Sequence, residues 1–583
     1  MGTVAIWRER AVDAARATAL ESVMSSPILA RVLASRGVTV ENLDAFRDSS
    51  LVRLTRSEDV PGVTEAVQVI LPFLRENRKI VVFGDYDVDG VCASAILVMT
   101  LRRLGGTNVD AFIPRRKDEG YGMTEASLAR LLEEHSDVAL VVTVDNGISS
   151  PDEIAALRAR GIAVVVTDHH IAGDRLPDAD ALVNTRIRSC PGCENLCGAG
   201  VAFFLAAALS IAARREKLYS GPKFGAPLLV LAGLATVADL MPLSDQNRIL
   251  VSQSLALFRE HAPLGLHELY HRAARTASDV ASRDYGFMLS PRINAAGRMN
   301  DARKAYDLLM TQNREEARLL ACEIDGFNGN RRSLEASMFK AACGQVDATD
   351  GLEAVVVRGE EGGTADAPGW HPGIAGIVAS RLLEKYHVPV AVAVGCTGSV
   401  RAPEGYNVHA ALSEVSEHLV RFGGHALAGG FTVRDGSFDA FKSAFSLACA
   451  RQKMLTQAPQ AAVIEFDGWI DPADLMAEAG LFNALDSVLK PYGEGNPEPV
   501  FGLRAVGLKD VDVMGAGGHH LSMRFVNQCI PRGVWWGQGA RAETLRARAA
   551  IPHDILFTLT MSSFGLEQDH LELRIVDVRP ARG

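Results

Sequence analysis

Residues 80–90 read Ile80-Val81-Val82-Phe83-Gly84-Asp85-Tyr86-Asp87-Val88-Asp89-Gly90. The apolar run at the start predicts a buried strand, and the polar residues after it predict a turn that feeds a helix. Asp85, Asp87 and Asp89 stand at alternate positions, so on an extended turn their side chains point to roughly one side. Carboxylates this close are tolerated when they are solvated or neutralised by a cation, so the stretch predicts a divalent-metal site.

The calcium loop of an EF-hand opens with the same Asp-x-Asp-x-Asp-Gly pattern. That interpretation fails at the twelfth loop position, which is Ile96 where a bidentate glutamate is required. It also fails because the preceding element is a predicted strand rather than a helix. Any further ligands must therefore come from elsewhere in the chain.

Composition indicates an ordinary soluble protein of several domains. At roughly 150 residues a domain, the 583 residues predict about three or four domains. The first 21 residues are charged throughout, which excludes the core of a signal peptide and makes the cytoplasm the expected location. The longest apolar stretch, Val201–Ala213, is shorter than the roughly 18 residues of a membrane span and predicts a core helix. The net charge of −10 argues against nonspecific coating of nucleic acid but allows a local basic channel.

Strands alternate with helices beyond the opening stretch. The predicted strands are 80–83, 109–113, 138–144 and 163–166, and the predicted helices are 91–104, 124–134 and 151–160. This alternation predicts a parallel, doubly wound sheet, whose ligands bind at the carboxyl ends of its strands.

The rest of the chain predicts a second α/β lobe and a barrel. Residues 301–346 read as a long helix, residues 352–450 alternate strands with helices again, and short strands follow at 461–466, 500–508, 521–525, 555–560 and 571–576. Five short strands with turns suit an OB-like β-barrel. The expected organisation is an N-terminal helical segment packing on the first lobe (1–70), the first α/β lobe (71–300), a connecting helix (301–346), the second α/β lobe (347–455) and the OB-like barrel (459–583).

Polar clusters follow two more of the predicted strands. Asp145 ends one strand, Asp168-His169-His170 ends the next, and Asp239 follows the apolar run 228–238. Singly, Asp145 suits a turn before Gly147, Asp168 a helix N-cap and His169 a structural histidine. Together they deliver carboxylate and imidazole to one sheet edge, and mostly oxygen ligands with one imidazole favour Mn²⁺ or Mg²⁺ over zinc.

Cysteines are thinly spread except for Cys190, Cys193 and Cys197. A C-x-x-C pair followed by a third cysteine suits zinc binding or redox chemistry. No fourth ligand follows at finger-like spacing, so a closed structural zinc site is disfavoured, and the role of the three cysteines stays open.

Four motifs resemble the signatures of the DHH phosphoesterase superfamily: Asp85–Gly90, Asp145–Ile148, Asp168–His170 and Ala238-Asp239. Further motifs are similar to the RecJ family of single-strand-specific exonucleases within it, and they cover nearly the whole chain. They are Glu119–Gly122, Leu196–Val201, Pro291–Arg298, Trp370–Arg381, Gly423–Ala426 and Pro491–Phe501.

The resemblance implies a site with two Mn²⁺ or Mg²⁺ ions. The implied metal-binding residues are Asp87, Asp89, Asp145, His169 and Asp239, with Asp145 between the ions and Asp85 in support. His170 is implied to face the scissile phosphate, and Asp145, Asp168 and His170 form the implied catalytic set. The ions would supply the nucleophile and neutralise charge at phosphorus.

A second set of residues suits the binding of nucleic acid. Arg116 and Arg298 carry planar forks that match phosphate oxygens. By resemblance, Ser399 and Arg401 receive a 5′-terminal phosphate, although Gly-Ser-Val-Arg-Ala-Pro departs from the usual Ser-Gly-Arg-Ser, and the Gly424-His425 turn allows a close approach. Trp535 and Trp536 offer stacking surfaces, but neighbours in a strand point to opposite faces, so at most one of the two is expected to stack. Trp535 is the tryptophan assigned to the binding of the strand. Ser522 stands where the family often has lysine.

The resemblance implies a 5′-to-3′ exonuclease that releases mononucleotides from single-stranded DNA in recombination and repair. Its implied partners are single-strand-binding protein and a RecQ-type helicase, and a monomer with no membrane association is expected. Two alternatives stay open: a phosphodiesterase for short oligonucleotides or cyclic dinucleotides, and an inactive recruitment module. The intact acids disfavour the module, and the chain length disfavours the small-substrate enzyme, which needs only two lobes.

Overall fold

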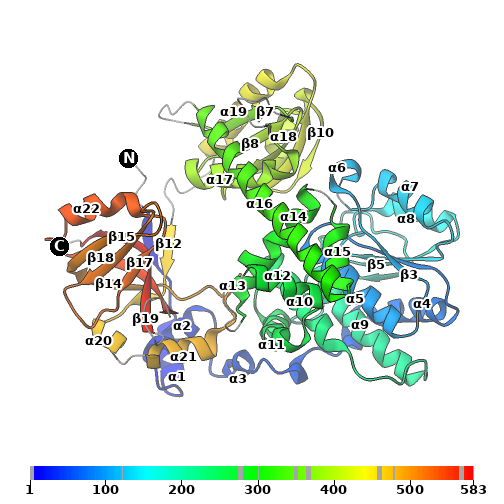
Figure 1. Ribbon diagram of the computed structural model, residues 1–583, viewed down its shortest axis with the longest axis horizontal. Helices are drawn as coiled ribbons and strands as arrows, with labels where there is room; N and C mark the ends of the chain where they lie inside the picture. Colours follow the sequence, from blue (N-terminus) through cyan, green and yellow to red (C-terminus); the bar gives the residue numbers. More distant parts are fainter. Residues whose placement is uncertain are drawn as a thin grey trace.

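The computed structural model describes residues 5–120, 122–273, 280–299, 301–346, 352–362, 369–455, 463–476, 479–562 and 570–581. Figure 1 shows two α/β lobes, one above the other, and a barrel beside them. This is the predicted fold class of two lobes joined by a long helix with a C-terminal OB-like barrel. Tyr121 of the Glu119–Gly122 motif and the predicted boundary residues 347–351 and 459–462 lie outside the described residues.

The first lobe is built on a five-stranded parallel sheet in the order β3-β2-β4-β5-β6. Its strands are β2 (Ile80–Phe83), β3 (Val109–Phe112), β4 (Leu140–Val144), β5 (Ala163–Thr167) and β6 (Ala181–Val183). The chain runs outward from β2 to β3 and then returns to the other side of β2 at β4, so the topological switch point lies between β2 and β4. Asp85 and Asp145 follow these two strands.

Helices cover both faces of this sheet because its strands are apolar on both faces. Ile80 and Val82 belong to one core with α4 (Val63–Arg75), α5 (Val88–Arg103) and α9. Val81 and Phe83 belong to the opposite core with α7 (Glu125–Glu134) and α8 (Pro151–Ala159). Successive side chains of a strand point to opposite faces of the sheet, so a parallel sheet that is buried on both faces needs apolar residues at every position.

A helical layer completes the first lobe. It contains α9 (Gly198–Arg215), α10 (Gly225–Ala238), α11 (Asp245–His261), α12 (Leu264–Ala273), α13 (Ser282–Asp284), the π-helix η3 (Tyr285–Leu289), α14 (Ser290–Met299) and α15 (Arg303–Met310). α9 is longer than the predicted Val201–Ala213, and its 18 residues are long and apolar enough to cross a membrane. It is a core helix here, since 61% of it is buried and it packs with α5 and α10.

The predicted helix 301–346 is two helices, so its predicted start is wrong. α15 ends at Met310, and Asn313 caps the new helix α16 (Arg314–Gly344) by accepting hydrogen bonds from the backbone N–H groups of Glu315 and Glu316. α16 leads from the first lobe to the second (Figure 1). A side-chain acceptor that starts a new helix explains the break, because it satisfies donors that have no partner within the helix.

The second lobe holds a mixed sheet in the order β10-β11-β9-β8-β7. Its strands are β7 (Val355–Gly359), β8 (Val390–Val394), β9 (Thr397–Arg401), β10 (Leu419–Gly424) and β11 (Ala428–Val433), with helices α17 (Ala375–Tyr386), α18 (Val408–Glu414) and α19 (Phe438–Leu455). β7 and β8 are parallel, and the other pairs are antiparallel. The sheet edge with β10 and β11 forms a glycine-rich hairpin.

The barrel has seven strands in one sheet, ordered β13-β14-β18-β19-β17-β16-β15, where five were predicted. They are β13 (Gly468–Trp469), β14 (Phe501–Val506), β15 (Leu508–Met514), β16 (His520–Phe525), β17 (Gly533–Trp535), β18 (His553–Ser562) and β19 (His570–Pro580), with α20 (Pro472–Met476), α21 (Ala479–Leu489) and α22 (Ala542–Ala547). The predicted strand 500–508 divides into β14 and β15. β13 and β17 are too short to produce a periodic pattern.

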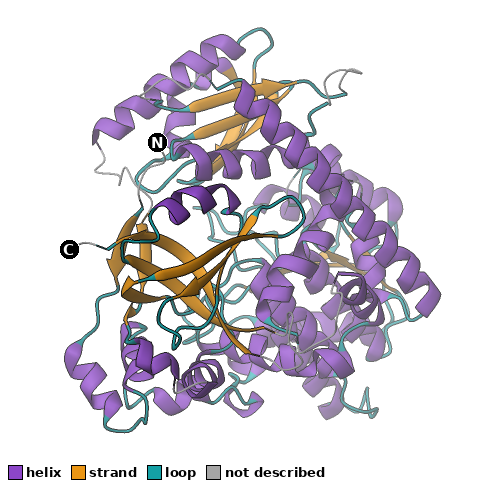
Figure 2. Ribbon diagram, turned by 60° about the vertical axis from the view of Figure 1, so that its left-hand side comes forward, coloured by secondary structure: helices purple, strands orange, loops and turns teal. Residues whose placement is uncertain are grey.

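The N-terminal segment packs mainly on the barrel, so the prediction that it packs on the first lobe is wrong for most of its length. β1 (Ile6–Glu9) pairs in parallel with β12 (Val463–Phe466), which the sequence placed in the barrel sheet. Helices α1 (Ala14–Glu21) and α2 (Pro27–Ser35) share the barrel core. Figure 1 shows both helices below the barrel, and in Figure 2 helices lie below the strands of the barrel. The end of the segment, from Leu54 onward, packs against the first-lobe core. The apolar face of a helix indicates that the face is buried, but it does not indicate which part of the protein covers it.

Arg248 of α11 fastens the barrel to the first lobe. Its side chain is buried and donates hydrogen bonds to the carbonyl oxygens of Val488 (2.7 Å), Leu489 (3.1 Å), Lys490 (2.8 Å) and Phe46 (3.0 Å). The first three carbonyls lie at the C-terminal end of α21, where the last carbonyl groups of a helix have no N–H donor within the helix. One guanidinium therefore satisfies the end of a barrel helix from within the first lobe.

Replacing this guanidinium should loosen the junction. We expect Arg248→Met to lower the free energy of unfolding of the barrel unit by at least about 3 kcal/mol, because it leaves buried carbonyls without donors. Urea unfolding followed by tryptophan fluorescence measures this, since Trp7, Trp469, Trp535 and Trp536 lie in or beside the barrel. Arg259→Met, at an exposed position of the same helix, is the matched control with an expected change within about 0.5 kcal/mol. Equal midpoints for the two variants would contradict this role.

Candidate metal centre

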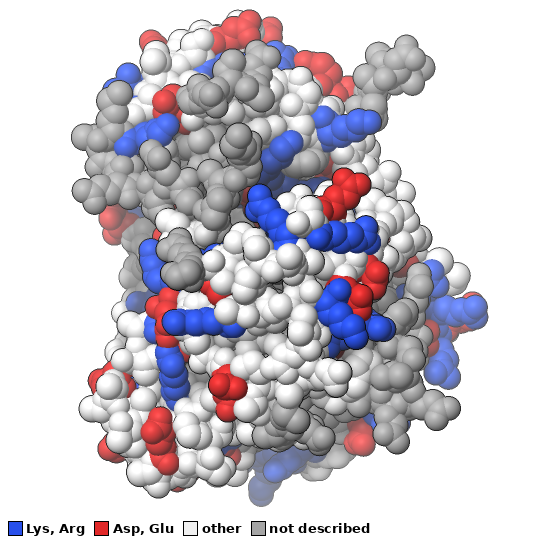
Figure 3. All heavy atoms as spheres, turned by 90° about the vertical axis from the view of Figure 1, so that its left-hand side faces the viewer, with Lys and Arg blue, Asp and Glu red and all other residues white. Residues whose placement is uncertain are grey.

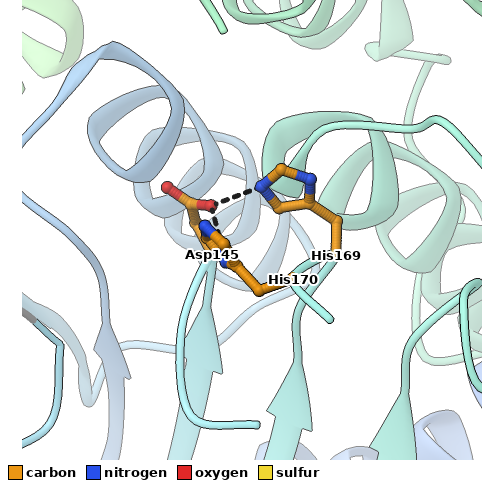
Figure 4. A group of neighbouring side chains, drawn as sticks. All are labelled: Asp145, His169 and His170. Carbon is orange, nitrogen blue, oxygen red and sulfur yellow. Dashed lines mark ion pairs between the residues drawn. The ribbon is translucent and has the colours of Figure 1, made fainter. Parts of the chain in front are cut away.

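Asp145 lies at the centre of the polar residues that follow the strands of the first lobe. It follows β4 directly and adopts the left-handed backbone conformation, with φ of +62°, which is uncommon outside glycine. Its Oδ1 lies 3.1 Å from His169 Nε2 and 4.0 Å from His170 Nδ1. Figure 4 shows both imidazole rings directed at this carboxylate. Strained backbone of this kind is concentrated at functional sites.

Asp85 and Asp87 approach Asp145 from β2. Asp87 caps α5, and its Oδ1 accepts hydrogen bonds from the N–H groups of Asp89 (2.9 Å) and Gly90 (3.1 Å). Both carboxylate oxygens of Asp85 are buried without a hydrogen-bond partner among the described residues. A Cβ at Gly90 would stand 2.4 Å from the Asp85 backbone nitrogen, so this position accepts only glycine.

Asp89 points elsewhere, which corrects the prediction that the three acids of the opening stretch face one side. α5 begins at Val88, so Asp89 lies in the first helical turn rather than on an extended turn. Its two oxygens accept hydrogen bonds from the N–H groups of Gly198 (2.6 Å) and Ala199 (2.7 Å) at the N-terminus of α9. The helix dipole there favours a negative charge.

Asp239 lies close to the same histidine as Asp89. It caps the C-terminal end of α10, and its Oδ2 lies 3.6 Å from His169 Nε2, the same separation as that between His169 Nε2 and Asp89 Oδ2. The Asp239 Oδ2 atom is buried without a hydrogen-bond partner among the described residues. His169 thus lies between acids contributed by α5 and α10.

Asp168 and His170 form a separate hydrogen-bonded pair. Asp168 Oδ1 accepts hydrogen bonds from the His169 N–H (2.7 Å) and the His170 N–H (3.1 Å), and it lies 2.8 Å from His170 Nδ1. Its Oδ2 accepts a hydrogen bond from the Ile148 N–H (3.0 Å). Asp168 is therefore satisfied within the protein and belongs to none of the possible metal-binding groups among the described residues. It positions His170, whose side chain is 42% exposed.

Burial and mutual repulsion shift the pKa values of these groups. Burial, followed by the charges of neighbouring aspartates, raises the pKa of Asp85, Asp87 and Asp145, and it raises that of Asp239 to about 8. Burial lowers the pKa of His169. For His170, burial acts to lower the pKa, but the hydrogen bond to Asp168 and its charge raise it overall. Burial and like charges disfavour the ionised form of these acids, and a bound cation would offset both effects.

The donor atoms form three overlapping groups, each with atoms within 4.8 Å of one another. They are Asp85, Asp87 and Asp145; Asp89, His169 and Asp239; and Asp145, His169 and His170. Asp145 occurs in two of them and joins the first strand end to the histidines. Carboxylate oxygens with few imidazoles fit Mn²⁺ or Mg²⁺. Buried carboxylate oxygens without partners make this fit specific, because a free buried charge is costly.

Three arginines gather beside this site. Arg116 begins the short helix α6 (Arg116–Glu119), and its guanidinium carbon lies 5.0 Å from the ring centre of Tyr86. Burial, and then the charge of Arg116, lowers the pKa of Arg298 to about 10 and also lowers that of Arg401. The predicted residues Arg116, Arg298 and Arg401 therefore lie together, although they come from both lobes. Like charges held this close favour an anionic ligand.

Ser399, Gly424 and His425 lie on the neighbouring strands of the second lobe. Ser399 in β9 is opposite Gly430 of β11, which is opposite Gly423 of β10. The exposed His425 sits at the tip of the hairpin and donates its backbone N–H to Ala428 O (2.8 Å), and Ala428 is opposite Arg401. Gly424 has a φ of +139°, and a Cβ there would lie 2.4 Å from Ala428 O, so the turn requires glycine.

The prediction that Trp535 binds the strand is wrong. Its side chain is 5% exposed and belongs to the barrel core, with the Arg541 guanidinium over its ring. Trp536 is the exposed member of the pair at 54%, and it lies in the turn that follows β17. The sequence could show that the two rings face opposite ways but could not show which face is the core.

The three clustered cysteines are buried free thiols. Cys197 caps α9, since its sulfur accepts a hydrogen bond from the Gly200 N–H. None of the possible metal-binding groups among the described residues contains a cysteine.

The sequence analysis quoted the motifs that contain Gly198, Ala199 and Asn294 but missed the role of these three residues in holding the acids in place. Gly198 and Ala199 bind Asp89 through their backbone, and Asn294 Oδ1 accepts a hydrogen bond from the Val88 N–H (3.2 Å). A Cβ at Gly198 would lie 2.5 Å from the Asp145 Cβ. The small residues before the apolar run of α9 were the available signal, because close backbone approach needs them.

Comparisons with known proteins agree along the chain. Three family models match it: DHH family, N-terminal domain, over residues 79–233; DHHA1 domain over residues 341–451; and RecJ OB domain over residues 466–577. The single-stranded-DNA-specific exonuclease RecJ of Haemophilus influenzae is 34% identical over 495 residues, 82% of this chain and 84% of that protein. The Escherichia coli protein of the same name is 35% identical over 500 residues, covering 82% and 83%.

Solved structures give the same result. A crystal structure of RecJ from Thermus thermophilus in complex with Mn²⁺ matches with a TM-score of 0.82 at 30% identity, covering 99% of this chain and 80% of that one. The same protein in complex with Mg²⁺ matches with a TM-score of 0.76. With its two lobes and barrel matched in order, and with relatives above 30% identity over four fifths of its length, this chain belongs to the RecJ family of DHH proteins.

Proposed function

We propose that this protein hydrolyses phosphodiester bonds of single-stranded DNA from the 5′ end and releases mononucleotides. The observation that carries the proposal is that two sets of acidic residues meet at Asp145 and His169. The first set is Asp85 and Asp87, and the second is Asp89 and Asp239. Three arginines lie beside them. The printed name of the relatives, single-stranded-DNA-specific exonuclease, supports the substrate. The proposed catalytic unit comprises the first lobe (71–300), the connecting segment (301–346) and the second lobe (347–455), and the barrel unit begins at 459.

The proposed ligands of two Mn²⁺ or Mg²⁺ ions are Asp87, Asp89, Asp145, His169 and Asp239, with Asp85 in support. The unpartnered oxygens of Asp145 and Asp239 support this assignment. When bound, the ions would activate water and offset the charge that develops at phosphorus. The protein itself holds the acids apart from one another by backbone hydrogen bonds to Asp87 and Asp89, so no rearrangement is needed before a cation binds.

His170 is the proposed contact to the scissile phosphate, and Asp168 is its positioning residue. The Asp168 carboxylate keeps the imidazole protonated to a higher pH than usual, since it raises the pKa of His170 against the opposing effect of burial. A protonated ring donates a charge-assisted hydrogen bond to a phosphate oxygen, or a proton to the leaving oxygen.

The proposed pocket for the terminal 5′-phosphate consists of Arg116, Arg298, Ser399 and Arg401, closed by the Gly424-His425 turn. An anion there would relieve the repulsion between the arginines, which burial strengthens. Because this pocket lies beside the acids, a strand held by its 5′ phosphate would present its first phosphodiester bond to them.

The proposed setting follows from this substrate. A nuclease that needs an unpaired strand depends on proteins that unwind duplexes and cover single strands, so a RecQ-type helicase and single-strand-binding protein are the proposed partners. Family resemblance supports both partners. A cytoplasmic location and a monomeric state are proposed as well.

Replacing the shared acid tests the enzyme directly. With Mn²⁺ and a 5′-phosphorylated, 3′-labelled single strand, we expect progressive shortening from the 5′ end by the unchanged protein. Asp145→Asn should slow it by at least about 10³-fold, because several kcal/mol of charge stabilisation is lost. Asp435→Asn, at an exposed turn, is the control with an unchanged rate. Digestion from the 3′ end, or cleavage restricted to dinucleotides, would refute the proposal.

Metal removal should make stability depend on pH. The raised folded-state pKa of Asp85, Asp145 and Asp239, against about 3.9 in the unfolded chain, stabilises the fold at low pH and loses this effect as the pH rises toward about 8. The raised pKa of His170 acts in the same direction. In EDTA we therefore expect a lower melting temperature at pH 8 than at pH 6.5.

Two variants and one addition check this pH effect. Asp239→Asn should shrink the difference between the two pH values, and Asp435→Asn should leave it unchanged. Saturating Mn²⁺ should stabilise the protein more at pH 8, because the ligands must be deprotonated to bind. Melting temperatures in EDTA that are equal at both pH values would show that the acids are not held as described.

A further inference from the structure

Strand β3 forms an open edge of the first-lobe sheet, and guanidinium groups cover that edge. Phe112 O points inward and accepts a hydrogen bond from the Gly84 N–H (2.9 Å), and Asn108 O likewise faces β2. The carbonyl groups at the alternate positions point outward, where the sheet ends. Each of them accepts a hydrogen bond from an arginine: Val109 O from Arg102 (2.8 Å), Ala111 O from Arg303 (2.9 Å) and Ile113 O from Arg130 (2.8 Å).

Arg130 of α7 differs from the other two arginines because it also reaches the turn that carries Arg116. Its guanidinium donates hydrogen bonds to both carboxylate oxygens of Glu119, at the end of α6, and the contact to Oε2 measures 3.0 Å. The same guanidinium lies over the Phe112 ring, with its carbon 4.0 Å from the ring centre. A two-point contact between a guanidinium and a carboxylate fixes the orientation of both groups as well as their distance.

Glu119 in turn holds the backbone on which Arg116 stands. Its Oε2 accepts a hydrogen bond from the Arg115 N–H (2.7 Å), and its own N–H donates to Arg115 O (2.8 Å). Glu119 O accepts a hydrogen bond from the hydroxyl of Thr124, the N-cap of α7 (2.9 Å). α6 has only four residues, and so short a helix is not stable through its own hydrogen bonds. The position of Arg116 therefore depends on Glu119.

The ion pair between Arg130 and Glu119 is largely buried, with side chains that are 18% and 7% exposed. Burial acts to raise the pKa of Glu119, but hydrogen bonds from Arg130 and the Arg115 N–H lower it overall. Arg130 also contacts Glu134 (2.9 Å), whose side chain is 44% exposed. Loss of a partner from the buried pair leaves a charge uncompensated, whereas loss of an exposed partner has little effect.

Arg116 needs this support because like charges surround it. Its charge adds to the burial that lowers the pKa of Arg298 and Arg401, so the three guanidinium groups repel one another. Figure 1 shows α6 at the upper end of the first lobe, which is the end nearer to the second lobe. A side chain on a loose turn would swing away from the other two cations. A fixed turn keeps Arg116 in place before an anion binds, which lowers the cost of binding.

A general positive surface does not take over this task on the side of the barrel. On the face of the molecule that Figure 3 shows, basic and acidic side chains are interspersed. A surface of mixed charge does not single out a terminal phosphate. Recognition of the strand end therefore falls to the arginine cluster and to the groups that hold it.

We propose that the Arg130–Glu119 ion pair positions Arg116 and thereby sets the preference of this protein for a 5′-phosphate over a 5′-hydroxyl end. Both are positioning residues, which act through the backbone of α6 rather than by touching the strand. This inference rests on the proposed function, because it takes the arginine cluster as the pocket for the terminal phosphate.

Equilibrium binding in EDTA measures this preference without cleavage. Two 3′-labelled single strands of one sequence, one with a 5′-phosphate and one with a 5′-hydroxyl, are titrated with protein, and fluorescence anisotropy gives the ratio of their Kd values. The unchanged protein should bind the phosphorylated strand more tightly. Arg130→Met should reduce the ratio about tenfold, as expected when a hydrogen bond to a charged group is weakened, and should leave the Kd of the hydroxyl strand unchanged.

A double change shows whether the ion pair acts through Arg116. Arg116→Met should reduce the ratio at least as much as Arg130→Met does. Adding Arg130→Met to Arg116→Met should then cause no further loss, because nothing is left to position. Arg130→Lys keeps the charge but loses the planar fork, so it should recover part of the ratio.

Matched controls come from the same contacts. Glu134→Gln removes the exposed partner of Arg130, and Arg102→Met removes the guanidinium at the other end of β3, so both should leave the ratio unchanged. Glu119→Gln keeps the size of the side chain and should reduce the ratio as Arg130→Met does. If Arg130→Met does not fold, as its melting temperature would show, Glu119→Gln decides the test.

The inference is overturned if the folded variants keep the ratio of the unchanged protein, if they weaken the binding of both strands equally, or if the losses add in the double variant. Equal binding of both strands by the unchanged protein would refute the phosphate pocket and this inference with it. Failure of the proposed enzymatic activity is a different result, because the unchanged protein would then shorten neither strand in Mn²⁺, whatever the ratio of Kd values.

Discussion

The burial of mutually repelling carboxylates at one sheet edge is the constraint on which the first lobe depends. Asp85, Asp89 and Asp145 are almost wholly buried, and the charges of neighbouring acids add to the burial that raises the pKa of Asp85 and Asp145. Backbone N–H groups stabilise two of the acids at this edge: Asp87 caps α5 and accepts a hydrogen bond from the Asp89 N–H, and the N-terminus of α9 donates hydrogen bonds to Asp89. Glycines at 90 and 198 let these helices approach where a Cβ would collide. The repulsion that remains is what a cation would relieve.

Two regions near this centre differ in charge. The arginines that meet between the lobes are cationic and partly desolvated, which suits a phosphate group. A groove between the first lobe and the barrel is lined by apolar residues and by three cations and three acids, so it carries no excess of positive charge. α10 connects these regions, since its last turn carries Asp239 and leads into Leu240. Arg248 of α11 is hydrogen-bonded to the end of α21, which joins the barrel to the helical layer that contains α10.

Much of this could be predicted from the sequence because its signals are local. β2 has the predicted bounds, and parallel strand ends brought Asp145, His169 and Asp85 together as expected. The failures concern tertiary partners. A helix start at Val88 turned Asp89 toward α9, β1 paired with a strand more than 450 residues away, and packing decided that Trp535 is buried. The sequence does not indicate that Phe287 is exposed or that the backbone of Leu240 is left-handed, because both depend on how η3 and α10 pack.

The central claim is that the buried acids form one site for two cations joined by Asp145. Calorimetric titration of Mn²⁺ into the metal-free chain tests it most directly, because it counts ions and measures each affinity. Two ions should bind to each chain, and Asp145→Asn should weaken both binding steps, whereas Asp435→Asn should weaken neither. Binding of a single ion, or an Asp145→Asn variant that loses one step and retains the other unchanged, would contradict a site joined by this residue.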